Sequence, residues 1–240
     1  MLPKIDSPVY GMTLPISKKS INYRPFLVKE QKNLLMAMEA DDKESIERNV
    51  KHILHNCTLT PNIDIEQLPV VDVEYYFLQL RAKSVGEIVE NKYICNNEVN
   101  GTACGNSMLV KFDINAIKVE QDENASDVIQ LTDKISIKMQ YPKFSTMESL
   151  KSTNTSVDMA FKIVADSIEY IFDGDQYYYA NESDPKELVE FIESLNTEQF
   201  SKLEKFFKNL PKIKKELDFT CDKCGFHHHI NVEGLENFFG

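Results

Sequence analysis

The spacing of apolar residues predicts three helices in the first part of the chain. Apolar residues recur at helical spacing from about 26 to 40, from about 43 to 56 and from about 72 to 90. The apolar positions are Leu27, Leu34, Leu35 and Met38 in the first, Ile46, Val50, Ile53, Leu54 and Cys57 in the second, and Val73, Tyr76, Phe77 and Leu80 in the third. Each segment has one apolar stripe, so we predict a compact helical lobe over residues 26–91.

Alternation with a period of two replaces this spacing in the middle of the chain. Residues 107–119 and 134–141 are rich in strand formers, and the segment 135–139 alternates as a half-buried strand does. Residues 120–127 between them are polar and acidic, which is typical of a loop. These segments predict a small β region after the helical lobe.

Helical spacing returns in the last third of the chain. It runs from about 158 to 172 and is followed by a turn and a short tyrosine-rich strand at 177–179. Two further helices begin at the capping sequences Asp184-Pro185 and Asn196. The whole pattern predicts an α+β fold, with residues 113–216 as an inserted region of strands and helices and 234–240 as a C-terminal tail.

The first 25 residues differ from the rest because proline interrupts them and apolar residues are dispersed. The prolines are Pro3, Pro8, Pro15 and Pro25. Because proline removes a backbone donor and disfavours helix, we predict that residues 1–25 form an extended arm that lies on its own domain or on a partner. Ordering such an arm costs entropy, so we expect residues 1–22 to be poorly ordered in the isolated protein and ordered in a complex. Its candidate partner-binding residues are Val9, Tyr10 and Leu14.

Four cysteines form two separated pairs. Cys95 and Cys104 have eight residues between them, whereas Cys221 and Cys224 have two. Each pair ends in Cys-Gly, and a strand-forming stretch follows it. This layout is typical of two zinc knuckles, in which glycine lets backbone amides turn toward the sulfurs. Four thiolates around Zn²⁺ would make a closed tetrahedral site that stabilises the fold and leaves no position for water or substrate.

The cysteine pattern predicts a zinc-ribbon-like module made of residues 92–112 and 217–233. Disulfides and unrelated reduced thiols are the alternatives, and disulfides are disfavoured because the N-terminal sequence lacks the apolar core of a signal peptide. His227, beside the last pair, offers an imidazole that could replace a cysteine, although alternate residues of a strand point to opposite faces. Cys57 falls on an apolar helix stripe and is expected to lie in the core.

Composition limits the classes of function. The chain has 240 residues, 42% of them hydrophobic, which supports one or two modest domains. Its net charge of −11 disfavours nucleic acid as a partner, since a phosphate-binding surface is basic. No apolar run approaches the length of a membrane span, so we expect an acidic, soluble, cytosolic protein without a membrane partner.

Sequence motifs for catalysis are not found. The chain lacks a phosphate-binding loop, a dinucleotide fingerprint, a nucleophile elbow and an HExxH motif. Asp173-Gly174-Asp175 is interpreted as a turn, because the remaining oxygen ligands of a calcium loop are missing. No nucleophile, base and orienting group stand together. We therefore expect a protein that is not an enzyme and binds no small-molecule substrate.

Several segments resemble the baseplate hub proteins of T-even-like contractile-tail bacteriophages. They are 23–30, which begins Tyr23-Arg24-Pro25-Phe26, then 34–39, 68–69 and 72–87, and finally Cys221 to Gly225 leading into 234–239. The resemblance spans nearly the whole chain and is weakest over about 113–160. It implies a hub subunit or a factor that helps the hub assemble, with other phage baseplate and tail hub proteins as partners.

The resemblance also implies a location and leaves alternatives open. The protein would act in the host cytoplasm during assembly and then in the virion tail baseplate, or leave before completion as an assembly chaperone. A zinc-ribbon regulator that binds nucleic acid is the alternative from another class, and the acidic charge disfavours it. Tyr23, Arg24, Phe26 and Arg81 are of types enriched at interfaces, so they are further candidate partner-binding residues, with ordinary packing as the other reading.

Overall fold

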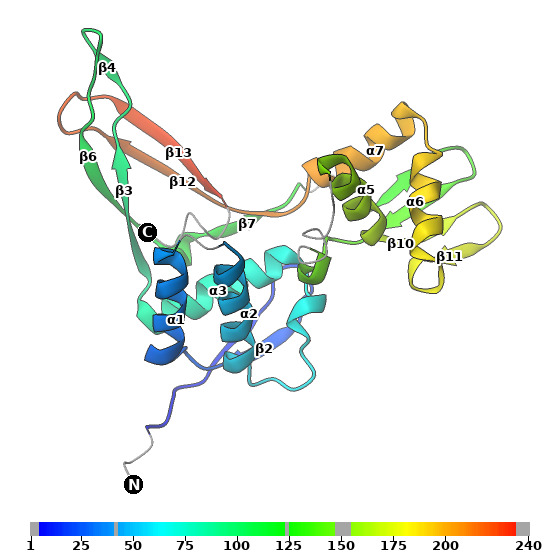
Figure 1. Cartoon of the computed structure of the whole chain (residues 1–240), viewed down its shortest axis with the longest axis horizontal. Coiled ribbons are helices and arrows are strands. Elements are labelled where there is room, and N and C mark those ends of the chain that lie inside the picture. The colour runs from blue at the N-terminus through cyan, green and yellow to red at the C-terminus, as the bar shows by residue number, and fades with distance from the viewer. Residues whose placement is uncertain (1–4, 41–42, 123–124, 147–154, 234–240) are drawn as a thin grey trace. The chain divides into compact units, whose positions relative to one another are not determined.

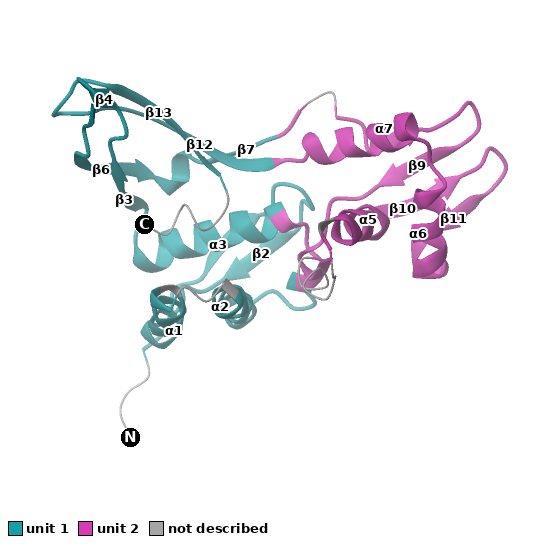
Figure 2. Ribbon diagram, turned by 45° about the horizontal axis from the view of Figure 1, so that its top comes forward, with its two compact units in different colours: residues 1–65, 71–120, 212–240 teal, residues 66–70, 121–211 magenta. Residues whose placement is uncertain are grey.

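The computed structural model describes residues 5–40, 43–122, 125–146 and 155–233. The predicted tail at 234–240 lies outside these residues. Helices and strands are mixed along the chain, which confirms the predicted α+β class (Figure 1). The chain divides into two compact units, drawn in different colours in Figure 2. Unit 1 contains residues 1–65, 71–120 and 212–240, and unit 2 contains residues 66–70 and 121–211.

Unit 1 joins three helices to paired strands. Its elements are β1 (Tyr10–Thr13), β2 (Ser20–Tyr23), α1 (Val28–Glu39), α2 (Lys43–Cys57), α3 (Val70–Val85), β3 (Ile88–Ile94), β4 (Glu98–Val99), β5 (Thr102–Ala103), β6 (Ser107–Asp113), β7 (Lys118–Glu120), β12 (Lys212–Thr220) and β13 (His227–Glu233). Strand β3 pairs with β6, and β12 lies between β7 and β13; all these pairings are antiparallel. The predicted helical lobe and the predicted cysteine module therefore belong to one unit.

Helix α3 is buried on two sides of unit 1. Leu78 and Ala82 belong to the apolar cluster that the strands complete, whereas Tyr76, Phe77 and Leu80 are fully buried outside that cluster. The strand residues of the cluster are Val89 from β3, Phe112 from β6, Ile213 and Leu217 from β12, and Val232 from β13. Burial of apolar side chains on more than one side places α3 in the interior of unit 1.

The third helix is shorter than predicted. It ends at Val85 rather than near residue 90, and Gly86 follows with a φ of 131°. Such a φ suits glycine because it has no Cβ, so the chain leaves the helix there. The residues that were expected to continue the helix instead form β3, in which Ile88 lies opposite Asp113 and Ile94 opposite Ser107.

The predicted N-terminal arm is a β-hairpin that packs on its own unit. Tyr10 of β1 lies opposite Tyr23 of β2, and Leu14, Ile21 and Tyr23 are at most 2% exposed. The carboxylate of Asp72 in α3 accepts hydrogen bonds from two amides of the turn, each 2.8 Å long. The prediction of a poorly ordered arm at 1–22 is therefore wrong for residues 10–22, since the dispersed apolar residues meet once the hairpin forms.

An ion pair ties the hairpin to the first two helices. Arg24 Nη2 lies 2.9 Å from Glu30 Oε1, and the Arg24 amide donates to the Cys57 carbonyl at 3.0 Å. Burial opposes ionisation of Glu30, but hydrogen bonds from Arg24 and from the Leu27 amide lower its pKa below the usual value. Cys57 is fully buried, as predicted, and burial raises its pKa to about 12.

Unit 2 is an antiparallel sheet covered by helices. Its elements are β8 (Val128–Gln130), β9 (Ser136–Met139), α5 (Ser156–Asp166), β10 (Ile168–Phe172), β11 (Tyr177–Tyr179), α6 (Pro185–Glu193) and α7 (Thr197–Lys208). The strand order is β11-β10-β9-β8. One core contains Ile129, Ile137 and Ile171 from the sheet together with Leu188 and Leu203 from the helices, so the helices cover one sheet face.

Helix α5 stops earlier than its periodicity predicts. The predicted helix at 158–172 ends at Asp166, and residues 168–172 form β10 between β9 and β11. The apolar residues there fit either period, and pairing with β9 selects the strand. The two predicted helix starts are confirmed: Asp184 accepts a hydrogen bond from the Lys186 amide, and Asn196 forms a capping box with Gln199.

Candidate metal centre

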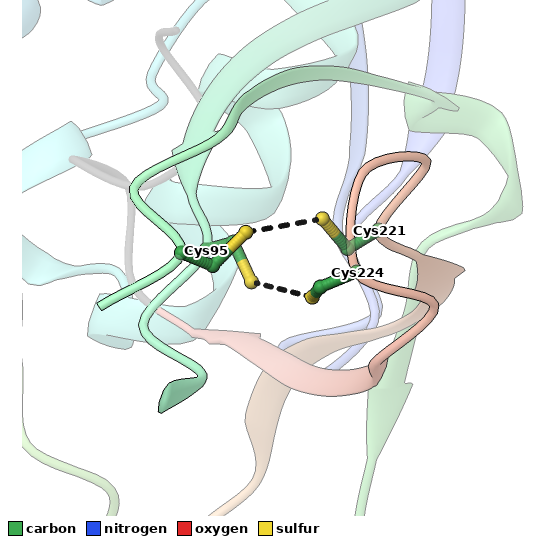
Figure 3. Close-up of side chains that lie close together, drawn as sticks. Cys95, Cys221 and Cys224 are labelled. Carbon is green, nitrogen blue, oxygen red and sulfur yellow. Dashed lines mark hydrogen bonds between the residues drawn. The ribbon is translucent and has the colours of Figure 1, made fainter. Parts of the chain in front are cut away.

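The four paired cysteines come together at the tips of two hairpins of unit 1. Cys95 follows β3 and Cys104 precedes β6, whereas Cys221 and Cys224 lie in the turn between β12 and β13. Their four sulfurs all lie within 4.8 Å of one another. Figure 3 shows the sulfurs of the two segments pointing toward each other. Cys95, Cys104 and Cys221 are buried, and Cys224 is partly exposed.

The sulfur separations fit a tetrahedral thiolate site. Cys95 Sγ lies 3.7 Å from Cys224 Sγ, and Cys104 Sγ lies 3.9 Å from Cys221 Sγ. Four sulfurs bound at about 2.3 Å in a tetrahedron are about 3.8 Å apart, which agrees with both distances. A disulfide needs about 2.05 Å, so neither pair is bonded, and all four cysteines are free thiols. The disulfide alternative is thereby set aside.

The two hairpin tips have the same backbone pattern. The Gly105 amide donates to the Cys95 carbonyl at 3.0 Å, and the Gly225 amide donates to the Cys221 carbonyl at 2.9 Å. The first cysteine of each pair donates its amide to the residue two after the second cysteine, in both cases at 2.8 Å. Both glycines have positive φ, 62° and 72°, which favours glycine over residues with a Cβ.

The long spacing of the first pair has a simple structural cause. Strands β4 and β5 form a small hairpin between Cys95 and Cys104, and the Cys104 amide donates to the Asn97 carbonyl at 2.8 Å to close it. The sulfurs of the two cysteines are therefore brought within 4.8 Å of each other, as are those of the short pair. A spacing of eight residues here is a knuckle with a hairpin inserted into it.

Backbone amides and burial set the acidity of the thiols in opposite directions. Hydrogen bonds from the Cys224 and Lys223 amides help to lower the pKa of Cys221 to about 6, and the Phe226 amide lowers the pKa of Cys224. Burial raises the pKa of Cys95 to about 12. A thiol that binds a metal is deprotonated, and burial makes the thiolate of Cys95 unfavourable. A cation between the sulfurs would offset this cost of ionising a buried thiol.

A histidine supports the site, but it is not the expected one. His228 is buried, and its Nε2 lies 3.3 Å from Cys95 Sγ, whereas the exposed His227 lies near Asp218 and Thr220. The ring of His228 stacks on Phe219 with centroids 5.2 Å apart. In the tautomer with a proton on Nε2, it donates to the sulfur. The alternation along β13 decides which histidine faces inward.

Two asparagines also contact the sulfurs, and sequence reasoning missed them. Asn97 Nδ2 and Asn106 Nδ2 each lie 3.6 Å from a sulfur, that of Cys224 and that of Cys221 respectively. Lys223 Nζ donates to the Cys104 carbonyl at 2.8 Å. Each asparagine lies two residues after a cysteine of the first hairpin but contacts a sulfur of the second. These contacts join the two tips independently of a metal.

Most of the predicted partner-binding residues are buried in unit 1 or make contacts within it. Leu14, Tyr23 and Phe26 are buried within unit 1, so they present little surface to a partner, and their partner-binding role stays a prediction. Arg24 is paired with Glu30 as described. The remaining three differ: Val9 is 61% exposed, the ring of Tyr10 lies tilted beside that of Tyr23, and Arg81 is partly buried and donates to the Gly86 carbonyl.

The cysteine cluster stands alone among the described residues as a group of three or more close metal-ligating side chains. Within the same parts of the chain, none of the helices is long and apolar enough to cross a membrane. The arrangement is a closed set of four sulfur ligands, which suits a structural metal site rather than a catalytic one.

Comparison with known proteins identifies the family. A family model described as T4 bacteriophage base plate protein matches residues 7–240. Comparisons with curated proteins and with solved structures gave no match. The matched region includes both cysteine pairs and both units. The chain therefore belongs to the T4 bacteriophage base plate protein family.

Proposed function

We propose that this baseplate protein is a component of the baseplate hub and acts in baseplate and tail assembly through contacts with other hub proteins, without catalysing a reaction. The family match over residues 7–240 is the observation that carries the proposal. The segments at 23–30 and 72–87 that resemble hub proteins support the finer assignment. In this proposal the protein acts in the host cytoplasm during assembly and its partners are other baseplate proteins.

We further propose that the cysteine cluster binds one Zn²⁺ through Cys95, Cys104, Cys221 and Cys224. Tetrahedral all-sulfur sites suit zinc or iron, and the closed, paired-knuckle geometry favours structural zinc. The ion would join hairpins whose cysteines are 117 or more positions apart in sequence. The ion would neutralise the charge of the thiolates. By joining the two hairpins it would make unit 1 more rigid, so that its surfaces keep one conformation when they contact neighbouring subunits.

Particle composition and a deletion mutant test the hub proposal. Phage carrying a disrupted copy of this chain should accumulate unjoined tail precursors, because a missing hub component blocks later steps. Quantitative mass spectrometry of purified wild-type tails should find the chain at a fixed ratio to other baseplate proteins. If it is absent from finished tails while the mutant still fails to assemble, the protein is an assembly chaperone. Normal tails and infectivity in the mutant would contradict both readings.

Metal analysis tests the zinc proposal separately. Protein purified without chelators should contain about one zinc per chain by elemental analysis. Iron in place of zinc, or no metal, would contradict the assignment. A low-salt filter-binding assay with duplex DNA tests the regulator alternative, and binding by this acidic chain would favour it.

A further inference from the structure

The sheet of unit 2 has one covered face and one open face. The helices pack on the side that carries Ile137 and Ile171. The opposite side carries four aromatic rings from β10 and β11, in the cross-strand pairs Tyr170 with Tyr179 and Phe172 with Tyr177. We call these four residues the aromatic face; they are Tyr170, Phe172, Tyr177 and Tyr179.

The rings of the aromatic face contact one another and still reach solvent. Tyr170 lies edge-on to Tyr177 and Tyr179, with centroids 5.1 and 5.8 Å apart. Phe172 and Tyr177 are 4.7 Å apart. Tyr177 and Tyr179 are 54% and 44% exposed. Exposed aromatic residues that gather on one face are typical of a binding surface rather than of scattered surface residues.

The strand at the border of this face has an unpaired edge. Strand β11 pairs with β10 on one side and, within the described residues, with no strand on the other. Sheet edges are commonly protected by lysine or proline, but residues 168–179 contain no lysine, arginine or proline. The edge therefore lacks these protecting residues, and on it the Tyr179 carbonyl accepts one hydrogen bond, from the Ser183 hydroxyl at 2.9 Å.

The charge around the aromatic face is acidic. Residues 166–184 carry six acidic side chains and no lysine or arginine; the acidic ones are Asp166, Glu169, Asp173, Asp175, Glu182 and Asp184. Two of them hold the local fold, since Asp173 accepts from the Asp175 and Gln176 amides and Asp184 caps α6. Two lysines lie close by: Lys138 opposite Tyr170 is paired with Asp127, and Lys134 lies beside Gly174 in the turn between β10 and β11.

We propose that the open edge of β11 and the aromatic face bind an extended, basic segment of another protein. Its backbone would add a strand to the edge of β11, and alternate lysine or arginine side chains would lie over the rings, whose negative faces attract cations. The acidic surroundings select this partner by charge. Nucleic acid, or a second copy that presents the same face, would instead bring like charge to it. That the partner is a baseplate protein rests on the proposed function; the binding chemistry does not.

A defined peptide tests this binding on the full-length chain. The probe is a fluorescent decapeptide that alternates arginine with threonine, and its controls replace every arginine by citrulline or by glutamate. Fluorescence anisotropy should show binding of the arginine peptide that weakens at least ~5-fold between about 50 and 300 mM salt. The citrulline peptide should bind roughly tenfold more weakly, and the glutamate peptide should not bind.

Variants locate the binding. The double variant Tyr177→Ser/Tyr179→Ser should weaken binding about 5- to 30-fold, and Asp175→Asn/Glu182→Gln, which keeps the rings, should weaken it ~2- to 5-fold. Glu204→Gln on the exposed side of α7 is the matched charge control and should bind as the wild type does. When the arginine peptide is added, the largest changes in backbone amide chemical shift should occur in β10 and β11.

Several outcomes would overturn the proposal. They are no binding up to about 1 mM peptide, equal binding of the citrulline peptide, unchanged binding by the tyrosine variant, or shifts centred outside β10 and β11. Self-association of the wild-type chain that the tyrosine variant abolishes, or stronger binding of oligothymidylate than of the arginine peptide, would assign the face to another occupant. None of these results alters the composition of purified tails, so the hub proposal is tested independently.

Discussion

Unit 1 and unit 2 differ in the interactions that stabilise each of them internally. Unit 2 is built from the nearly continuous stretch 121–211, and one apolar core connects its sheet to α5, α6 and α7. Unit 1 gathers three separate stretches. An apolar cluster joins its two long hairpins, and at their tips four sulfurs meet beside the ring pair of Tyr93 and Phe219. Bringing together residues that are far apart in sequence costs more chain entropy than bringing together residues of one continuous stretch. We therefore expect the hairpin tips of unit 1 to depend on the proposed metal, whereas unit 2 depends on packing alone.

Loss of one thiolate gives the largest expected effect. Cys221→Ser should abolish metal binding and destabilise the hairpin pair by several kcal/mol, because the remaining buried thiols lose the cation that compensates them. Hydrogen exchange should show β12 and β13 losing protection while β8 to β10 keep theirs. The control is Cys57→Ala, a buried cysteine outside the cluster, which should retain the metal. Simultaneous loss of protection in both units would refute the idea that the two units are stabilised independently.

A core truncation in unit 2 provides the converse experiment. Ile137 is fully buried in the sheet, so Ile137→Ala should cost about 3 kcal/mol through lost burial and a cavity. Thermal unfolding should then show the transition of unit 2 shifted downward, with the metal content unchanged. Val128→Ala, at an exposed site on the neighbouring strand, is the matched control and should have little effect. Loss of metal in the Ile137 variant would show that the units are not independent.

The parts that could be predicted from the sequence are those with local causes. The first two helices follow from apolar stripes within single segments, and α6 and α7 follow from capping residues three or fewer positions from the amides they bond. The meeting of the four cysteines was predictable because residue type and the Cys-Gly endings restrict the chemistry. Even the long first pair fits once β4 and β5 are recognised as an insertion.

The errors arose where distant partners decide the structure. The β1–β2 hairpin is held in part by Asp72, more than 50 positions away, and nothing local reveals that contact. The segment 168–172 satisfies both helical and strand spacing until β9 pairs with it. The choice between His227 and His228 depends on the register of β13 against β12. Each of these outcomes is set by tertiary pairing.

The contact between His228 and Cys95 predicts a smaller effect within unit 1. His228→Ala should lower metal affinity roughly tenfold, because the sulfur loses a hydrogen-bond donor and the ring packing that positions it. Competition with a chelator at fixed pH measures the affinity. His227→Ala changes the adjacent, exposed histidine and should leave the affinity unaltered. His228→Asn should recover part of the loss if hydrogen bonding matters more than packing. Equal affinities for the two alanine variants would remove the supporting role.

The smallest predicted effect concerns acid sensitivity in unit 2. Hydrogen bonds from the Gln176 and Asp175 amides and from the Tyr178 hydroxyl lower the pKa of Asp173 below its usual value of 3.8. A carboxylate whose pKa is lower in the folded state adds stability above the unfolded pKa, and this contribution is lost as pH falls through the folded value. The turn between β10 and β11 should therefore loosen below about pH 4, ahead of the strands buried under the helices.

Exchange-resolved acid titration of wild type and Asp173→Asn measures this directly. The asparagine still accepts amide hydrogen bonds but does not titrate, so the variant should start with a weaker turn and show less further loss of protection below pH 4. Asp133→Asn, a carboxyl between β8 and β9 in the same unit, should retain the wild-type profile of the β10–β11 turn. An unchanged profile in the Asp173 variant would show that other carboxyls control the acid response. The proposed metal site should respond to acid by a different route, because its sulfurs must be protonated before the metal is lost. Asp173→Asn should leave that response unchanged, whereas Cys221→Ser should remove it.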